Sequence, residues 1–299
     1  MNASPRLLHQ VNQSTVAVQS VAPPSHPSVA VLGHERTASG VVLRPDGLIL
    51  TVQYVVLGAR SVSVIDADGR VVPAQVVAQD FHSGIALIRT SEPLAPGLEP
   101  CDIGAIAPGA DVFVVAVTSD GTRAVNDGIV TSVAAFEANW EFTLDHAIAT
   151  SARSPGLGGA PVVDARGRVL GITFLDLGEV GRFTLAIPAA CYAAHHAELL
   201  DNGRRVSRAP RAWAGFFCYT FRSHVVIAGV LPGSPAESSG MRAGDVIVAL
   251  DDQRVVDQRG LYERLWSQPP GSERAFRVFR GDDTAELMVR TTEAERFFA

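Results

Sequence analysis

The stretch from Arg153 to Phe174 reads RSPGLGGAPVVDARGRVLGITF. Its residue types and their spacing are those of a loop around a catalytic nucleophile. Its glycines Gly156 and Gly158 lie in a tight loop that runs into a Val/Ile-rich segment. A loop of this kind can present backbone N–H groups to a developing negative charge, as an oxyanion hole does. Acyl transfer also needs a nucleophile, yet no serine lies between Pro155 and Pro161. The stretch therefore resembles the frame of a nucleophile site without its nucleophile.

Residue types that bind metals do not occur here at metal-binding spacings. The cysteines Cys101, Cys191 and Cys218 are odd in number and far apart, which suits neither a zinc site nor a disulfide framework. His195 and His196 are adjacent on a predicted helix, so their side chains diverge by about 100° and cannot face one metal. No convincing phosphate-binding glycine loop or dinucleotide fingerprint is present. We expect no metal and no cofactor.

Composition and charge exclude several classes of protein. A chain of 299 residues with 47% hydrophobic and 19% charged residues is long enough for about two packed domains. A net charge of −6 argues against nucleic-acid binding, which needs a basic field. The absence of an 18-residue apolar run argues against membrane insertion, and the N-terminus lacks the apolar region of a secretory signal. With the cysteine pattern, these observations predict a cytoplasmic protein.

The pattern of secondary structure changes along the chain. Short Val/Ile-rich runs broken by turn signals fill Ser28 to Pro188 and predict an antiparallel β-barrel or sandwich, with a hairpin that turns at Gly69. A helix is predicted over Pro188–Gly203, followed by a linker. After about Ala212, strands alternate with predicted helices at Ser234–Ser239 and Asp257–Ser267, which indicates an α+β module.

The chain resembles the HtrA family over roughly Ser28 to Thr292. The motifs that support this resemblance include LAIP, which ends at Pro188, and GVLPGSPAESSGMRAGDVIVALDDQRV in the C-terminal part. The resemblance implies a mainly β fold, in which a chymotrypsin-like double antiparallel β-barrel is followed by an α+β PDZ domain. The expected domains are an N-terminal lead-in over 1–27, a trypsin-like protease domain over 28–203, a linker over 204–211 and a PDZ domain over 212–293.

The same resemblance locates the family's catalytic triad on residues that cannot perform its chemistry. The histidine's place in YVV is Tyr54, the aspartate's place before IAL is Gly84, and the serine's place in PGLGG is Gly158. Attack on a carbonyl needs a hydroxyl, an imidazole to accept its proton and a carboxylate to orient that imidazole. A phenol, with its ordinary pKa of about 10, is a poor base near neutrality. The expected triad is therefore vestigial.

Two alternatives concern the residues around these positions. The N–H groups of Gly156 and Gly158 would form the family's oxyanion hole, or both glycines simply allow a tight turn with positive φ. Ser154 and His82 are the nearest candidates for a displaced triad, and we interpret them as ordinary loop or surface residues. Because Tyr54 is larger than histidine, its phenol could fill the space that an aspartate leaves empty.

The C-terminal module resembles a PDZ domain, which binds a partner's C-terminus as an added strand and holds its carboxylate in a nest of N–H groups. In AWAGFFCYTF the nest would consist of the N–H groups of Ala214, Gly215 and Phe216. Leu261 and Leu265 lie four residues apart on a predicted helix and would line the groove's other wall. The alternative is that these leucines belong to the hydrophobic core.

The leading hypothesis is a catalytically inactive pseudoprotease that binds protein C-termini or extended peptides as a scaffolding module. The alternative is a serine endopeptidase of the HtrA family with non-standard catalytic residues. A third hypothesis is a structural subunit that co-assembles with an active relative. The family's trimer, which uses aromatic residues near the N-terminus, is not carried over because residues 1–27 contain no aromatic side chain.

Overall fold

The computed structural model describes residues 4–94, 96–177, 181 and 183–299 of the chain. Two compact units are present. The first contains Met1–Pro24, His34–Phe136 and Leu144–Ser207, and the second contains Ser25–Gly33, Glu137–Thr143 and Arg208–Ala299. The second unit thus includes a short segment from the middle of the chain, Glu137–Thr143, which we call the tip segment.

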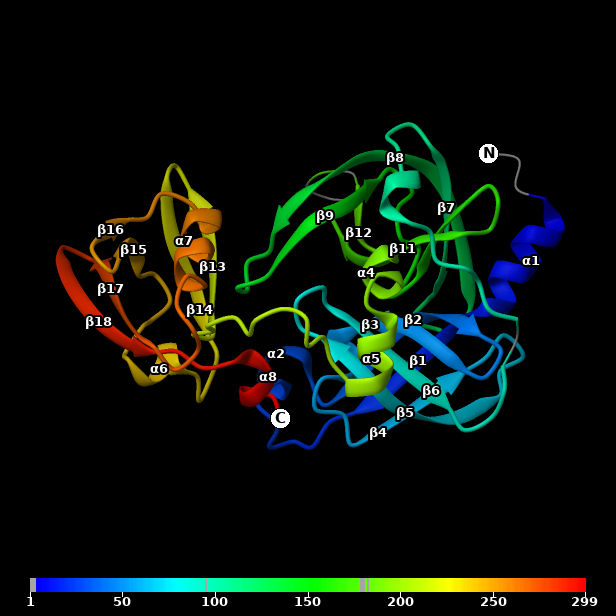
Figure 1. Cartoon of the computed structure of the whole chain (residues 1–299), viewed down its shortest axis with the longest axis horizontal. Helices are drawn as coiled ribbons and strands as arrows, with labels where there is room; N and C mark the ends of the chain where they lie inside the picture. Colours follow the sequence, from blue (N-terminus) through cyan, green and yellow to red (C-terminus); the bar gives the residue numbers. More distant parts are fainter. Residues whose placement is uncertain (1–3, 95, 178–180, 182) are drawn as a thin grey trace. The chain divides into compact units, whose positions relative to one another are not determined.

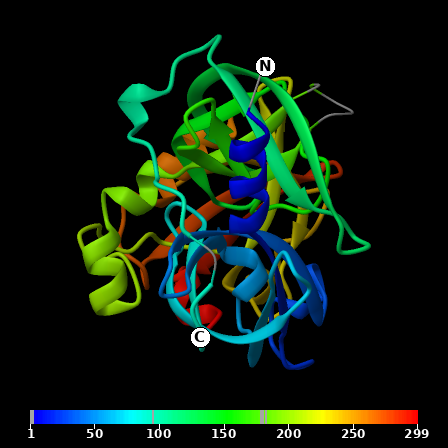
Figure 2. The same ribbon diagram turned by 90° about the vertical axis from the view of Figure 1, so that its right-hand side faces the viewer.

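The first unit consists of two closed antiparallel barrels (Figure 1). Closure leaves no strand edge unpaired, which protects an all-β unit from edge-to-edge association. Figure 2 shows the first barrel in blue to cyan and the second in green. The first barrel has the order β1-β2-β3-β6-β5-β4, with β1 (Thr15–Val21), β2 (Glu35–Arg44), β3 (Leu48–Val52), β4 (Ser61–Ile65), β5 (Val71–Asp80) and β6 (Ile85–Thr90). The second has the order β10-β11-β12-β9-β8-β7, with β7 (Asp111–Val117), β8 (Arg123–Glu137), β9 (Thr143–Thr150), β10 (Pro161–Asp164), β11 (Val169–Asp176) and β12 (Thr184–Pro188).

Burial along the strands follows from their sequences. The apolar run LILTV of β3 is buried at every position, whereas SVSVI of β4 has its valines buried and its first serine exposed. Side chains alternate between the two faces of a strand, so the second pattern marks a strand with one face toward the barrel interior. The hairpin between β4 and β5 turns at Gly69, whose φ of 81° confirms the predicted positive φ.

The predicted N-terminal lead-in contains regular secondary structure. It contains helix α1 (Pro5–Ser14), where the Ser4 hydroxyl accepts a hydrogen bond from the Leu7 N–H at 3.2 Å. Strand β1 follows and pairs with both β2 and β4, so the first barrel closes through it. The strands that pair with β1 come later in the chain, so the sequence of residues 15–21 by itself does not predict this pairing. Residues 1–3 of the predicted lead-in lie outside the described residues.

The helices of the first unit are short. Helix α3 (Gln53–Val56) follows β3, and a 3₁₀ turn spans Ile103–Ala105. The single helix predicted to end at Gly203 is two helices, α4 (Ala190–Ala193) and α5 (His196–Asn202). Gly203 caps the second of them in the left-handed region with a φ of 69°. Within the described residues, no helix is long and apolar enough to cross a membrane.

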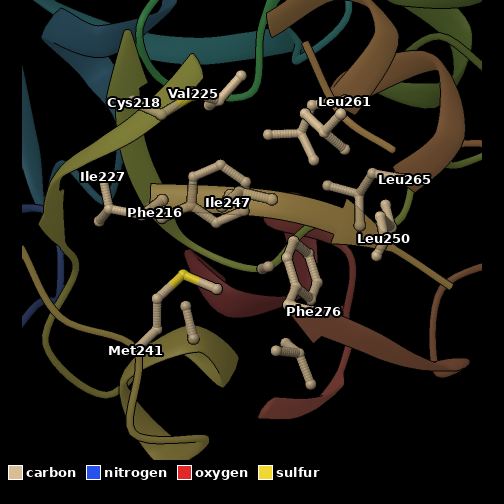
Figure 3. Close-up of a cluster of buried hydrophobic side chains, with 14 of the residues drawn as sticks. Phe216, Cys218, Val225, Ile227, Met241, Ile247, Leu250, Leu261, Leu265 and Phe276 are labelled. Carbon is tan, nitrogen blue, oxygen red and sulfur yellow. The ribbon is translucent and has the colours of Figure 1, made fainter. Parts of the chain in front are cut away.

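The second unit contains an antiparallel sheet with the order β13-β14-β15-β17-β18, and β16 pairs with β15. Figure 3 shows the side chains between this sheet and helix α7, including Phe216, Phe276, Leu261 and Leu265. The mainly β fold with two barrels and an α+β module is confirmed. The bounds are β13 (Phe216–Phe221), β14 (His224–Val230), β15 (Val246–Leu250), β16 (Gln253–Arg254), β17 (Glu273–Arg280), β18 (Asp283–Arg290), α2 (Val29–Leu32), α6 (Pro235–Ser238), α7 (Gln258–Leu265) and α8 (Ala294–Phe297).

Candidate functional site

Tyr54 and Gly158, which are 104 residues apart in the sequence (158 − 54), meet in the first unit. Tyr54 lies on α3, and a Cβ added at Gly158 would overlap the Tyr54 hydroxyl oxygen. The ring carbon that carries this hydroxyl would be 3.6 Å from the same Cβ, an ordinary contact distance. The phenol therefore stands where a side chain at position 158 would begin.

Gly84 is joined to the same place through the backbone. Its carbonyl accepts a hydrogen bond from the N–H of Gln53, the neighbour of Tyr54, at 2.8 Å. Its own N–H donates to the Asp80 carbonyl at 2.8 Å, and its φ is 76°. A residue other than glycine is uncommon at such a φ, although aspartate and asparagine adopt it more readily than most. The structure thus places Tyr54 beside Gly158, and Gly84 beside the residue that precedes Tyr54.

The glycine loop before β10 is held by hydrogen bonds at successive residues. Leu157 N–H donates to the Val117 carbonyl at 2.8 Å, and the Gly158 carbonyl accepts from Ser39 N–H at 2.7 Å. The Ser39 hydroxyl donates to the Leu157 carbonyl at 3.0 Å. The loop is therefore built into the first unit rather than free at its surface.

Positive φ does not explain Gly156 or Gly158. The loop residue in the left-handed region is Gly159, with a φ of 87°. Gly156 is needed for space instead, because a Cβ there would overlap the Val117 carbonyl oxygen. The reason for glycine at these two positions is the close approach of other atoms, the Val117 backbone at one and the Tyr54 hydroxyl at the other.

Burial also determines the chemistry of Tyr54. It raises the pKa of the phenol to about 12, so the hydroxyl stays protonated near neutrality and the phenolate that could accept a proton is scarcer than in a free tyrosine. The sequence suggested that this ring fills the space left by an aspartate. That suggestion stays a prediction, and the structure shows the hydroxyl of the ring beside Gly158, at the position predicted for the serine.

The two candidates for a displaced triad make local contacts. The Ser154 hydroxyl donates to the Gly156 carbonyl at 3.2 Å within its own loop. His82 N–H donates to the Asp80 carboxylate at 2.9 Å, and the Ser83 hydroxyl donates to the other oxygen of that carboxylate at 2.5 Å. The Ser154 side chain is thus used within its own loop. The His82 bond is made by the backbone, and His82 is a buried turn residue rather than a surface one.

In the second unit, the three N–H groups predicted as a nest converge on one carboxylate. Ala214 N–H donates to Glu141 Oε1 at 2.8 Å. Gly215 N–H and Phe216 N–H donate to Glu141 Oε2 at 2.6 and 3.2 Å. Gly215 has a φ of 88°, and a Cβ there would overlap the Ser234 side chain, so only glycine fits this turn. The nest residues therefore hold a carboxyl group, and that group is a side chain of the tip segment.

Helix α7 contacts the tip segment through residues that sequence analysis did not name. Tyr262 Oη donates to the Ala138 carbonyl at 2.9 Å, and Gln258 Nε2 donates to the same carbonyl at 3.2 Å. Leu261 and Leu265, predicted to line the groove, are 0% exposed in the apolar cluster with Phe216 (Figure 3). The leucines are core residues, as the alternative reading had it.

Gln258 and Tyr262 could have been found from the sequence, since they lie four residues apart and share a helix face. No local pattern marks Glu141. It is 73 residues before Ala214, and its neighbours Trp140 and Phe142 do not predict a contact with the nest. Among the described residues, no group of three His, Cys, Asp or Glu side chains is arranged to hold a metal ion.

Glu141 is expected to titrate near neutrality. Its side chain is buried, and burial raises its pKa to about 7, against the lowering effect of the three N–H donors. The titratable groups facing it are Tyr262 and Cys218, and burial raises the pKa of both above their usual values, so both are neutral. Because the raised pKa favours the protonated form, burial of Glu141 is most favourable below its ordinary pKa of 4.5 and becomes less favourable as pH rises from there through about 7.

The measurement is a ¹³C NMR titration of protein labelled at glutamate carboxyls, with Glu141→Gln used to assign the signal. One carboxyl signal, missing from the variant, should have its inflection near pH 7. An inflection below about pH 5, the range of a solvated glutamate, would show that Glu141 is not held in the buried contact.

Comparison with known proteins gives the same two-part arrangement. Residues 38–172 match the trypsin-like peptidase domain family, and residues 169–291 match the PDZ domain family. "Serine protease HTRA2, mitochondrial" of Bos taurus is 30% identical over 280 residues, covering 84% of this chain and 59% of the relative. "Probable periplasmic serine endoprotease DegP-like" of Halomonas elongata is 27% identical over 267 residues, covering 84% of this chain and 55% of the relative. The chain thus spans a little over half the length of these two relatives.

The fold is also similar to solved structures. A structure described as "HtrA-type protease AlgW with decapeptide" superposes with a TM-score of 0.57 at 22% identity, over 96% of this chain and 97% of that one. Another, the serine endoprotease from Yersinia pestis, gives a TM-score of 0.55 at 20% identity, over 96% of this chain and 97% of that one. At such identities the likeness concerns the fold alone.

Proposed function

Because this chain belongs to the HtrA family, in which a trypsin-like peptidase domain precedes a PDZ domain, we propose that it is a catalytically inactive member that binds peptides. The PDZ unit takes protein C-termini or extended peptides, and the former protease cleft serves as scaffold. The observation that carries the proposal is the nest of Ala214, Gly215 and Phe216 N–H groups around a carboxylate. A terminal carboxylate presents the same acceptor oxygens as the glutamate side chain that occupies this nest.

Inactivity is supported by the residues at the three triad positions. Gly158 has no hydroxyl, Gly84 has no carboxylate, and Tyr54 has a phenol with a pKa raised to about 12. The Tyr54 hydroxyl also takes the space in which a serine side chain at 158 would begin. Without any triad member, a fold of this kind accelerates hydrolysis by only about 10³–10⁴ over water.

The binding function predicts a signal for peptides with free carboxyl termini. A fluorescein-labelled library of C-terminal hexapeptides, titrated with the full chain and read by fluorescence anisotropy, should contain apolar-ended members that bind weakly. The same peptides with amidated C-termini should lose at least about tenfold in affinity, because charge-assisted hydrogen bonds to the nest are lost. A library in which every peptide fails to bind, or binds equally well when amidated, contradicts the proposed groove.

The relatives named as serine proteases favour an active endopeptidase as the rival function. Incubation with unfolded casein and a serine-reactive fluorophosphonate probe separates the two. We expect neither cleavage nor labelling, with an active HtrA protease treated in parallel to show that the assay works. Cleavage together with labelling would establish the rival.

Cytoplasmic location and co-assembly with an active relative stay predictions from the sequence. The printed name of one relative calls that protein periplasmic. Cell fractionation tests the location, and size-exclusion chromatography with and without an active relative tests co-assembly.

A further inference from the structure

The PDZ groove of this chain already contains a segment of the chain itself. The tip segment contacts both of its walls. On the strand side, Cys218 N–H of β13 donates to the Asn139 carbonyl at 2.7 Å. On the helix side, Tyr262 Oη of α7 accepts from Glu141 N–H at 3.0 Å while it donates to the Ala138 carbonyl.

The tip segment runs along β13 in the direction expected of a peptide that binds a PDZ domain as an added strand. Asn139 lies opposite Cys218, and Glu141 lies opposite the nest at Ala214–Phe216, so residue numbers rise on one side as they fall on the other. The tip segment and β13 are therefore antiparallel, and the later residues of the tip segment lie nearer the nest. A bound C-terminal peptide has this orientation, since its last residue must reach the nest with its carboxylate.

Glu141 supplies the carboxylate although the chain does not end there. Its φ is 43°, in the left-handed region that is uncommon for residues other than glycine. This turn allows the backbone to leave the groove toward β9 while the side chain remains in the nest. Two contacts hold the start of the segment. Gln258 Nε2 donates to the Ala138 carbonyl, and Arg259 forms an ion pair with Glu137, at 2.6 Å from Nε to Oε1.

From this geometry we propose that the tip segment is a built-in ligand, with Glu141 imitating a C-terminal carboxylate, and that it keeps the PDZ groove closed until an external C-terminus displaces it. The inference rests on the proposed peptide-binding function and names its regulation. One nest cannot hold two carboxylates, so internal and external ligands compete. The apparent affinity for an external peptide is then its intrinsic affinity reduced by the fraction of molecules with an open groove.

Replacing Glu141 should open the groove. In Glu141→Ala, three buried N–H donors lose their acceptor, and the tip segment loses its strongest attachment. We expect affinity for external peptides to rise at least about tenfold, as it would if roughly 90% of wild-type molecules are closed. The probe is a fluorescein-labelled hexapeptide that reproduces residues 136–140 and ends in valine with a free carboxylate. Glu286→Gln, an exposed glutamate on β18 of the same unit, is the matched control and should leave the affinity unchanged.

A second measurement needs no external peptide. Hydrogen exchange of the Gly215, Phe216 and Cys218 amides should be slow in the wild type and at least about tenfold faster in Glu141→Ala, while amides of β17 keep their protection and show that the unit is folded. Faster exchange together with tighter peptide binding supports the built-in ligand.

The outcomes distinguish failure of the built-in ligand from failure of the proposed peptide-binding function. If peptides bind the wild type and Glu141→Ala equally well, with exchange unchanged, the built-in ligand is refuted and the proposed function stands. If exchange accelerates but no peptide binds either protein, the proposed function fails and the regulatory role fails with it.

Discussion

A variant carrying Tyr54→His, Gly84→Asp and Gly158→Ser is expected to gain hydrolysis of unfolded casein and labelling by a fluorophosphonate. The Tyr54 hydroxyl already lies at Gly158, and the Gly84 carbonyl accepts a hydrogen bond from Gln53 N–H, next to Tyr54. The change supplies the hydroxyl, imidazole and carboxylate that a triad needs. Histidine at 54 also removes the hydroxyl that would overlap a serine at 158.

The expected gain is at least about 10³-fold over wild type, below the roughly 10⁶-fold that an intact triad supplies. Two features limit it. The φ of 76° at Gly84 strains an aspartate by about 1–2 kcal/mol. The imidazole and the hydroxyl must also reach hydrogen-bond distance in a cleft that has accommodated a phenol.

The matched control for this experiment is the same triple variant with Gly158→Ala. It carries the added Cβ and both other changes but has no nucleophile, so it should show neither labelling nor cleavage. Mass spectrometry should find the label on the peptide that contains position 158. Equal activity in the serine and alanine variants, or label elsewhere, would show that the three positions are not those of a triad.

Gly158→Ala alone is expected to destabilise the first unit by about 2–3 kcal/mol, because its Cβ overlaps the Tyr54 hydroxyl and overpacking of this kind costs 1–3 kcal/mol or more. The overlap is with the oxygen, and the ring carbon behind it is 3.6 Å away. The same change in a Tyr54→Phe background should therefore cost less than about 1 kcal/mol, which gives a coupling energy near 2 kcal/mol between the two positions.

Differential scanning calorimetry of the four proteins of this cycle measures the effect, and Gly158→Ala alone should lower the melting temperature of the affected transition by about 4–12 °C. Gly104→Ala is the control, since a Cβ at Gly104 meets no atom within 4 Å. If Gly158→Ala destabilises the wild type and the Tyr54→Phe variant by the same amount, the Tyr54 hydroxyl is ruled out as the reason for glycine at 158.

The extent of prediction from sequence differs between the two sites. At the positions predicted for the triad, the residue types decide the chemistry, since no packing can give Gly158 a hydroxyl or Gly84 a carboxylate. What the sequence could not give is the reason for the glycines. Positive φ, one of the two alternatives for Gly156 and Gly158, occurs at Gly159 instead, while those two positions are crowded by atoms from distant segments.

At the PDZ groove, the sequence identified the nest residues but not their occupant. The run AWAGFFCYTF marks Ala214, Gly215 and Phe216 because a short peptide motif encodes a local backbone turn. Glu141 reaches them from 73 to 75 residues away, and nothing near it in the sequence encodes that contact. For the same reason, the sequence left Leu261 and Leu265 undecided between groove and core, and only the packed structure placed them in the core.

By itself, the sequence determined the alternation of the strands, the order of the two folded modules and the identity of the side chains at the centre of the first. Those features depend on each residue's chemistry and on its near neighbours. The tertiary structure decided that β1 closes the first barrel, that the Tyr54 hydroxyl stands over Gly158 and that a glutamate fills the nest. Each of these is a contact between segments far apart along the chain, selected by the packing and hydrogen bonding of the whole fold, and no local pattern carries that information.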